Sequence, residues 1–386
     1  MFEDIKETLT SKEEKKVEYI ELIYDLIFVY LIGRNSSFIS LTEGGFIASE
    51  DFLTYVICTL VMIQIWNFTN FYINRYGSNG LQEHMLIFVN MFLLYFMGDA
   101  TRTDWSSYYY FKYNIPWALI MINFLICYWL KYREYKDTKP WESLHIICNM
   151  ILFGVEAAII LISLPIFSKT GLILSPLALV FGIIFLLATS KINNLVPVDF
   201  GHLSERAMLY IVFTFGEMII AMSGYFEGVV SFRSIYFALM GFLIVVGLFQ
   251  SYELCYDHLI DRELITNGIG YMMIHLFLIF ALSCITVALE FMREEEVALM
   301  PKTIFLTVSF VVYFVFLFLL GIYMKNRKKP GTRFIVKIVL ILAAFSVLMI
   351  VFREKPYINI AVTVALIYGI LGILVHAKNS TSGCHE

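Results

Sequence analysis

The sequence has 386 residues, of which 59% are hydrophobic and 16% charged, and its formal net charge is −4. A soluble domain carries charge on about a quarter of its residues, so this composition excludes an ordinary water-soluble fold and indicates a polytopic α-helical membrane protein. The few Lys and Arg residues lie in short loops, which argues against a nucleic-acid partner.

Apolar runs of about 20 residues predict about twelve transmembrane helices. No loop between the runs is long enough for a soluble domain. No GxxxxGK[ST] phosphate-binding motif occurs, so we do not expect ATP-driven pumping by this chain. In chain order the predicted helices span 17–38, 52–73, 82–100, 113–132, 142–164, 171–190, 203–224, 233–254, 268–290, 302–324, 334–352 and 357–376.

The two halves of the chain carry similar features in the same order, which predicts an internal repeat. EYIELIYDLIFVY, in the first helix, parallels HLSERAMLYIVFT in the seventh, and the same offset places IWNFTNFYINRY on FQSYELCYDHLI. Six helices per half give both halves the same orientation, and transporters commonly place their site between such repeats. We therefore divide the chain into an N-terminal segment 1–16, two six-helix repeats 17–190 and 191–378, and a tail 379–386.

Lys and Arg predict the orientation. With a cytoplasmic N-terminus, most of them fall inside, including the clusters KYREYKDTK and KNRKKPGTR. The positive-inside rule then predicts a multi-pass protein of the inner (plasma) membrane with both termini cytoplasmic. The N-terminus, MFEDIKETLTSKEEKKVE, is too polar for a signal peptide, so we expect the first helix to remain uncleaved.

Cysteines give no sign of a disulfide framework or a metal site. The sequence contains no CxxC pair and no HExxH motif, so we expect neither a zinc site nor another cofactor. Five of the six cysteines lie within apolar runs: Cys58, Cys127, Cys148, Cys255 and Cys284.

Carboxylates inside the first apolar run are the main functional signal. Glu21 and Asp25 are four residues apart and share one helical face. Asp25 lies about 12 Å into the run at 1.5 Å per residue. A lone carboxylate in lipid costs about 3 kcal/mol, so Asp25 must face protein or water, pair with a cation, or take up a proton. Glu156, in FGVEAAII, is the carboxylate with the most apolar flanks.

The seventh helix, HLSERAMLYIVFTFGEMII, offers a matching set of polar residues. On a helical wheel, His202, Glu205, Arg206 and Glu217 lie on one broad face. Arg206 is the expected cation for a carboxylate of the first helix. Gly216, beside the deeper Glu217, would let another helix or a ligand approach the backbone.

These two motifs resemble those of the bacterial low temperature requirement protein A family. VEYIELIYDLIFVYLI resembles its first motif, HLSERAMLYIVFTFGEMII its second, and YMMIHLFLIFALSCITVALE its later helix with a central His. In the Trp-rich segments of that family, this chain keeps only Trp66. The resemblance covers most of the chain and implies an integral membrane protein linked by name to growth in the cold, with no defined substrate or reaction. Carried over by motif position, the residues of interest are Glu21, Asp25, His202, Glu205, Arg206, Gly216, Glu217 and His275.

Three functions remain open. We favour a secondary transporter in which buried carboxylates couple a proton or cation to a small substrate between the repeats. An intramembrane lipid- or isoprenoid-modifying enzyme and a non-catalytic sensor or assembly factor for growth in the cold are the alternatives. We favour a protein that is not an enzyme, with membrane lipids and a small-molecule or ion substrate as partners, and leave a homodimer open.

The transporter interpretation depends on one spatial condition. It requires carboxylates of the two helices, Asp25 and Glu217 included, to meet one another and Arg206 in a shared polar chamber. For each of these residues the alternative is an interhelical ion pair that only fixes the register of the helices.

Overall fold

The computed structural model describes residues 15–39, 45–101, 105–226, 231–294, 296–325 and 331–382. Within these residues, 11 helices are long and apolar enough to cross a membrane, and an isolated β-bridge pairs Ile260 with Met324. The prediction of an all-α polytopic membrane protein is therefore confirmed. Most of the predicted segment 1–16 and the end of the tail 379–386 lie outside the described residues.

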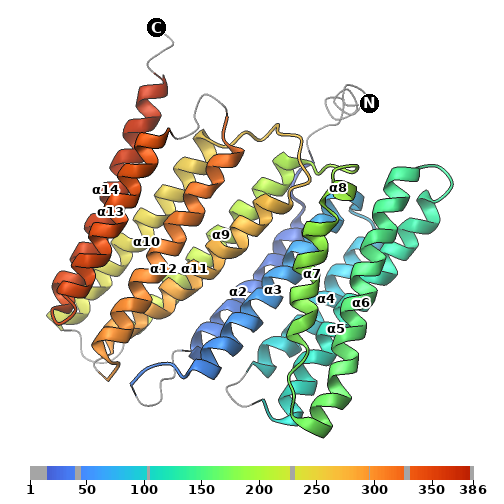
Figure 1. Ribbon diagram of the computed structural model, residues 1–386, viewed down its shortest axis with the longest axis horizontal. Helices are drawn as coiled ribbons and strands as arrows, with labels where there is room; N and C mark the ends of the chain where they lie inside the picture. Colours follow the sequence, from blue (N-terminus) through green and yellow to red (C-terminus); the bar gives the residue numbers. More distant parts are fainter. Residues whose placement is uncertain are drawn as a thin grey trace.

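The first half of the chain forms the blue-to-green part of Figure 1. Helix α2 packs against α3 and α4, α5 lies between α4 and α6, and α7 contacts both α6 and α3. The helices are α2 (Tyr19–Ile39), α3 (Ser49–Tyr76), α4 (Leu81–Ala100), α5 (Ser107–Tyr135), α6 (Pro140–Thr170), α7 (Pro176–Ala188) and the short α8 (Ser190–Asn193).

The second half forms the yellow-to-red part of Figure 1. Helix α9 packs against α10 and α11, α12 lies between α11 and α13, and α14 contacts both α13 and α10. The helices are α9 (Phe200–Ala221), α10 (Phe232–His258), α11 (Ile269–Arg293), α12 (Leu299–Leu319), α13 (Thr332–Val351) and α14 (Pro356–Ser382).

Helix α7 differs from the helix predicted over 171–190. It has 13 residues, or about 20 Å at 1.5 Å per residue. Gly171 takes a left-handed φ of 71° that ends α6, a conformation that glycine adopts without strain. Pro176 then opens α7, and the apolar residues 172–174 between them are not helical. These three residues can span at most about 10 Å, so together with α7 they can reach at most the thickness of a bilayer core, about 30 Å.

Helices α2 and α9 run parallel and in register at the boundary between the two halves. His202 contacts Glu21 and Arg206 contacts Asp25, and in both pairs the residue numbers differ by 181. A constant difference requires parallel helices, because an antiparallel pair would keep the sum constant. Five helices, α3 to α7, and the four-residue α8 lie between α2 and α9 in the chain. Successive helices cross a membrane in alternate directions, so parallel α2 and α9 require an odd number of crossings between them. The short α7 therefore counts as a crossing in addition to the 11 long helices.

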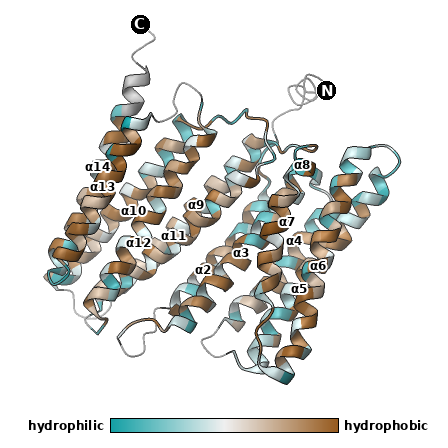
Figure 2. Ribbon diagram, viewed as in Figure 1, coloured by the Kyte–Doolittle hydropathy of each residue, from teal (hydrophilic) through white to brown (hydrophobic). Residues whose placement is uncertain are grey.

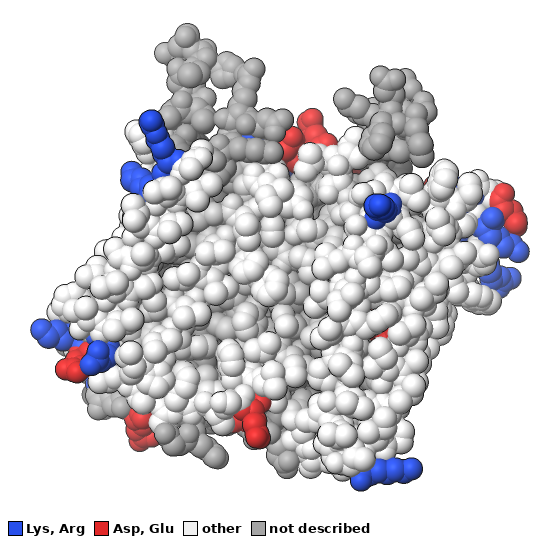
Figure 3. All heavy atoms as spheres, in the orientation of Figure 1, with Lys and Arg blue, Asp and Glu red and all other residues white. Residues whose placement is uncertain are grey.

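Side chains divide the surface into a broad apolar band and two polar rims. Figure 2 shows long brown stretches along the helices, and Figure 3 shows the Lys, Arg, Asp and Glu side chains gathered near the upper and lower ends. Large apolar residues lie on the outside, such as Leu340, which is 64% exposed, and Ile184, which is 60% exposed. Such a band suits a hydrocarbon environment. In the view of Figure 1, α2 begins at the same edge where α14 ends.

Candidate functional site

A buried ionic network joins α2 to α9 near the start of both helices. Arg206 Nη2 donates to Asp25 Oδ1 at 2.8 Å, and Arg206 Nε lies 3.3 Å from Glu21 Oε2. All three side chains are 0% exposed. The predicted ion pair between Arg206 and a carboxylate of the first helix is thus present, with both carboxylates taking part. Buried pairs of this kind persist only where each charge is compensated by close contacts.

Helix α3 supplies the neutral part of the network. Trp66 Nε1 donates to Asp25 Oδ1 at 2.9 Å, and Arg206 Nε donates to Asn70 Oδ1 at 2.8 Å. Asn70 Nδ2 in turn donates to the Trp66 carbonyl at 2.9 Å, which fixes the orientation of the amide. The sequence indicated Trp66 only as the indole kept from the family pattern and gave no role to Asn70. The sequence did contain a signal for this polar face of α3, since Trp66, Asn70 and Asn74 follow one another at a spacing of four and share one side of the helix.

The protonation of His202 follows from its neighbours. The backbone N–H of Asp199 donates to Asn74 Oδ1 at 2.9 Å, so Asn74 Nδ2 must face the other way. There it donates to the Asp199 carbonyl at 2.8 Å and to His202 Nδ1 at 3.1 Å. A nitrogen that accepts a hydrogen bond carries no proton. His202 is therefore the neutral Nε2–H tautomer, and Nε2, 3.3 Å from Glu21 Oε1, donates to that carboxylate.

Asp199 also fixes the residue at which α9 begins. Its side chain accepts a hydrogen bond from the His202 backbone N–H at 3.1 Å and caps the helix. Asx caps of this type satisfy an amide that has no partner within the helix. The cap, together with Asn74 of α3, holds the first turn of α9 beside the first turn of α2.

The nearest lysine does not neutralise the network. Lys15 Nζ donates to the carbonyl of Ile73 at 2.5 Å and to that of Gly77 at 3.3 Å, at the end of α3. Burial lowers the pKa of the Lys15 ammonium, and the carboxylates of Glu83 and Glu21 oppose that shift. The ammonium is therefore engaged by carbonyls at the helix end, where a cation is favoured, and forms no ion pair with Glu21.

Among the described residues, the network holds one more negative charge than positive charge. Two carboxylates face one guanidinium, and the imidazole beside them is neutral. Three buried atoms within it also lack a hydrogen-bond partner, Glu21 Oε2, Asp25 Oδ2 and Arg206 Nη1. Burying an uncompensated charge is costly, so the arrangement favours the uptake of one positive charge.

Glu217 lies apart from this network. It is half-buried, and a β-carbon on Gly33 of α2 would lie only 2.6 Å from Glu217 Oε1. Gly33 is two turns beyond Asp25, or about 12 Å along α2. Within the described residues Glu217 forms no hydrogen bond or ion pair. The expectation that Asp25 and Glu217 meet with Arg206 in one chamber is therefore wrong, because the wheel placed Glu217 by angle and ignored its height.

The remaining predicted residues also lie outside the network. No described atom lies within 4 Å of a β-carbon on Gly216, so the close helix approach occurs at Gly33 instead. Glu205 is half-buried and forms no hydrogen bond or ion pair among the described residues. His275 is 0% exposed. Its Nε2 bonds to the Tyr252 hydroxyl at 2.9 Å and its Nδ1 to the carbonyl of its own helix four residues back at 2.9 Å.

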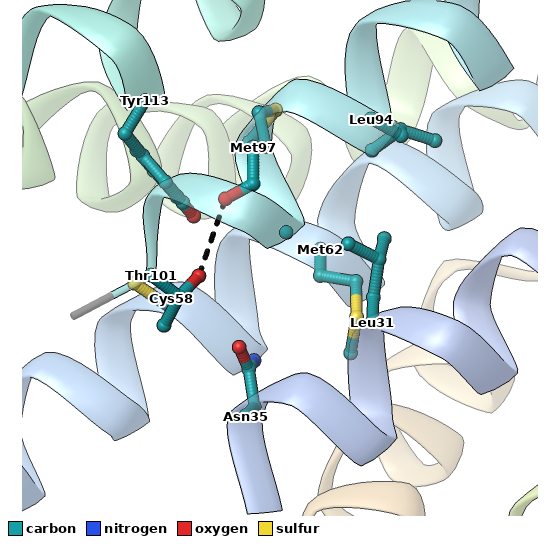
Figure 4. A pocket seen from close by; sticks show the side chains of 9 residues that line it. Leu31, Asn35, Cys58, Met62, Leu94, Met97, Thr101 and Tyr113 are labelled. Carbon is teal, nitrogen blue, oxygen red and sulfur yellow. Dashed lines mark hydrogen bonds between the residues drawn. The ribbon is translucent and has the colours of Figure 1, made fainter. Parts of the chain in front are cut away.

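A small cavity lies farther along α2, between α2, α3, α4 and α5. Figure 4 shows Asn35, Thr101 and Tyr113 around it together with apolar side chains such as Met62 and Leu94. Thr101 Oγ1 donates to the Met97 carbonyl at 3.3 Å. The cavity measures about 10 Å³, which is room for about one water molecule and not for an organic substrate.

The described residues contain no group of three or more His, Cys, Asp or Glu side chains that could hold a metal ion. In a comparison with protein families, the model of the family described as Bacterial low temperature requirement A protein (LtrA) matches residues 16–371. No curated protein matches the sequence.

Proposed function

The chain belongs to the bacterial low temperature requirement A protein family, and from that premise we propose that it is a proton-coupled secondary transporter. Its coupling site is the buried network of Glu21, Asp25, Arg206 and His202. The protein is an integral membrane protein, and the proposal concerns what the network does within it.

The charge imbalance of the network carries this proposal. With two carboxylates, one guanidinium and a neutral His202, the site is one positive charge short of neutrality. Arg206 stays protonated, so a proton can bind only to a carboxylate or to His202. The loaded site is neutral and the empty site is charged. Because charge is costly in a low-dielectric interior, loading and unloading change the relative stability of any two conformations that hydrate the site differently.

The position of the network supports a transport role. It joins the first helix of each proposed repeat, and parallel α2 and α9 agree with two repeats of the same orientation, 17–190 and 191–378. Each contact between helices α2 to α7 also has a counterpart among α9 to α14, as with α5 between α4 and α6 and α12 between α11 and α13. Transporters built from such repeats bind ions and substrates at the interface between halves and rock one half against the other.

A chain of polar contacts leads from one end of α9 to Asp25. It runs from the partly exposed Asp199 through Asn74 and His202 to Glu21, which contacts Arg206. With both termini in the cytoplasm, as the positive-inside rule favours, this end faces the cytoplasm. In the conformation described here, protons would therefore exchange from the cytoplasmic side of the plasma membrane. Membrane lipids and a small-molecule or ion substrate are the proposed partners, with a homodimer as the assembly to test.

The experiment starts from purified protein and a thermal-stability screen of metabolites and ions, which supplies a substrate. Uptake of that substrate into proteoliposomes is then measured with and without a pH gradient. We expect the gradient to drive uptake by the natural protein and not by Asp25→Asn. Glu205→Gln is the matched control, since Glu205 lies on α9 outside the network, and it should transport normally.

Three results would overturn the proposal. One is gradient-driven uptake by a folded Asp25→Asn protein at the normal rate. Another is uptake that ignores the pH gradient altogether. The third is turnover of lipid by the purified protein without any gradient, which would favour the enzyme alternative. Elution as a single species and an unchanged helical spectrum show that each variant is folded.

A further inference from the structure

Glu156 lies at the centre of α6 and is separate from the ionic network. It is about 24 Å from the start of the helix at Pro140 and about 21 Å from its end at Thr170, at 1.5 Å per residue. Its side chain is 0% exposed, and its neighbour Gln64 on α3 is 1% exposed. Both groups therefore lie near mid-membrane depth inside the first half of the molecule.

The contact between Glu156 and Gln64 uses only half of the polar atoms present. Gln64 Nε2 donates to Glu156 Oε1 at 3.1 Å. The other two oxygens, Glu156 Oε2 and Gln64 Oε1, are buried and have no hydrogen-bond partner. If Glu156 were ionised, both of these oxygens would be acceptors. Two adjacent groups would then share one donor, and two buried acceptors would stay unsatisfied, which is costly.

No cation compensates Glu156. Among the described residues it forms no ion pair, and Gln64 is its only hydrogen-bond partner. This is the opposite of Asp25, which has Arg206 at 2.8 Å. A lone ionised carboxylate at the centre of a membrane protein is strongly unfavourable.

The site is also too closed for a metal ion. On the side of α7, a β-carbon at Gly182 would overlap both Glu156 Oε1 and Gln64 Nε2. The glycine thus lets α7 pack directly onto the pair. Ca²⁺ takes about six to eight oxygen ligands and Mg²⁺ about six, whereas this pair offers two free oxygens.

We propose that Glu156 binds a proton and pairs, as a neutral carboxylic acid, with the carboxamide of Gln64. A proton on Oε2 converts that atom from an acceptor into a donor, which can bond to Gln64 Oε1. The acid and the amide then form a ring of two hydrogen bonds. A single proton satisfies both orphaned oxygens and removes the buried charge. This second proton site lies inside the first half and does not depend on the transport proposal.

Infrared spectroscopy of the purified protein in lipid tests the proposal. A protonated carboxyl group has a carbonyl band at higher frequency than the carboxylate bands, and this band shifts in D₂O. We expect the natural protein to lose one such band, equivalent to one group per chain, in Glu156→Gln. The substitution is isosteric and leaves an amide facing Gln64, so the fold is preserved. Glu205→Gln is the control and should leave this band unchanged.

A second variant tests the pairing itself. Gln64→Leu removes the partner, and the Glu156 carbonyl band should move to higher frequency because hydrogen bonding lowers it. The proposal fails if the difference between the natural protein and Glu156→Gln contains only bands of an ionised carboxylate. The pairing fails if the band stays in place in Gln64→Leu. Neither measurement requires transport, so the outcome does not depend on whether the protein proves to be a transporter.

Discussion

The two halves of the molecule share an arrangement of helices but differ in what they bury. In the first half, α3, α6 and α7 enclose Glu156 and Gln64, a group that carries a charge or a proton. In the second half, α10 and α11 bury Tyr252 and His275, and both ring nitrogens of the imidazole have a neutral hydrogen-bond partner. Among the described residues, the buried carboxylates therefore lie in the first half and at the boundary between the halves.

The difference between the two halves can be followed at single positions of the sequence. At the repeat offset proposed from the sequence, the positions of Gln64 and Glu156 fall on Leu248 and Leu340. Leu248 is buried, whereas Leu340 is 64% exposed on the outside of α13, so the two leucines form no buried pair. Polar groups in membrane interiors are expensive and are retained where they have a role or a close partner. The buried acid of the first half therefore has no counterpart at the position that the proposed offset gives.

The largest effect should come from removing the cation at the boundary. Arg206→Met leaves Glu21 and Asp25 buried without a counter-charge, and breaking a buried pair in this way costs about 3–5 kcal/mol. The check is the free energy of unfolding measured with denaturant in detergent micelles. Arg262→Met is the control, since Arg262 pairs with Asp257 at a site where both side chains are nearly half exposed, and surface pairs contribute about 0–1 kcal/mol. Equal losses in the two variants would contradict a special role for the boundary.

The second-largest loss of stability should come from removing the indole N–H of Trp66 in α3. Trp66→Phe keeps the ring contact with Tyr210, whose centroid is 4.4 Å away, but removes the hydrogen bond to Asp25. Hydrogen bonds to charged groups contribute about 1.5–3 kcal/mol, so the free energy of unfolding should fall by that amount. Trp129→Phe offers a comparison, because Trp129 is 45% exposed on the outer face and should change stability little. If both substitutions cost the same, Trp66 contributes only packing.

The close approach of α7 to the acid in the first half should respond to a single methyl group. In Gly182→Ala the new methyl would overlap Glu156 and Gln64, and overpacking a tight interior costs about 1–3 kcal/mol. Gly154→Ala, on α6, has no atom within 4 Å of the added methyl and should stabilise the helix by about 0.5–1 kcal/mol. Opposite signs for the two variants in thermal unfolding would support the contact, and a neutral Gly182→Ala would refute it.

Sequence reasoning found the ion pair of Arg206 with the first helix because a charge at membrane depth needs an opposite charge. It missed Asn70, because a neutral amide in a membrane helix has many acceptable environments and no single required partner. It misplaced Glu217 because a helical wheel gives the direction of a side chain and not its height, and three turns of α9 span about 16 Å. It extended the sixth helix through residues 172–174 because hydropathy does not distinguish apolar helix from apolar extended chain. Gly171 and Pro176 were the local signals that separate the two.

The smallest effect should appear in the neutral pair of the second half. Tyr252→Phe removes the hydroxyl that bonds to His275 Nε2, and a neutral hydrogen bond contributes about 0.5–1.5 kcal/mol. The imidazole keeps its second bond to the helix backbone, so the histidine should remain in place and stability should fall only slightly. Tyr95→Phe provides the baseline for losing a phenolic hydroxyl on the surface, because Tyr95 of α4 is 56% exposed. A loss as large as that of Arg206→Met would mean that His275 holds a charge, and the contrast between the two halves would then fail.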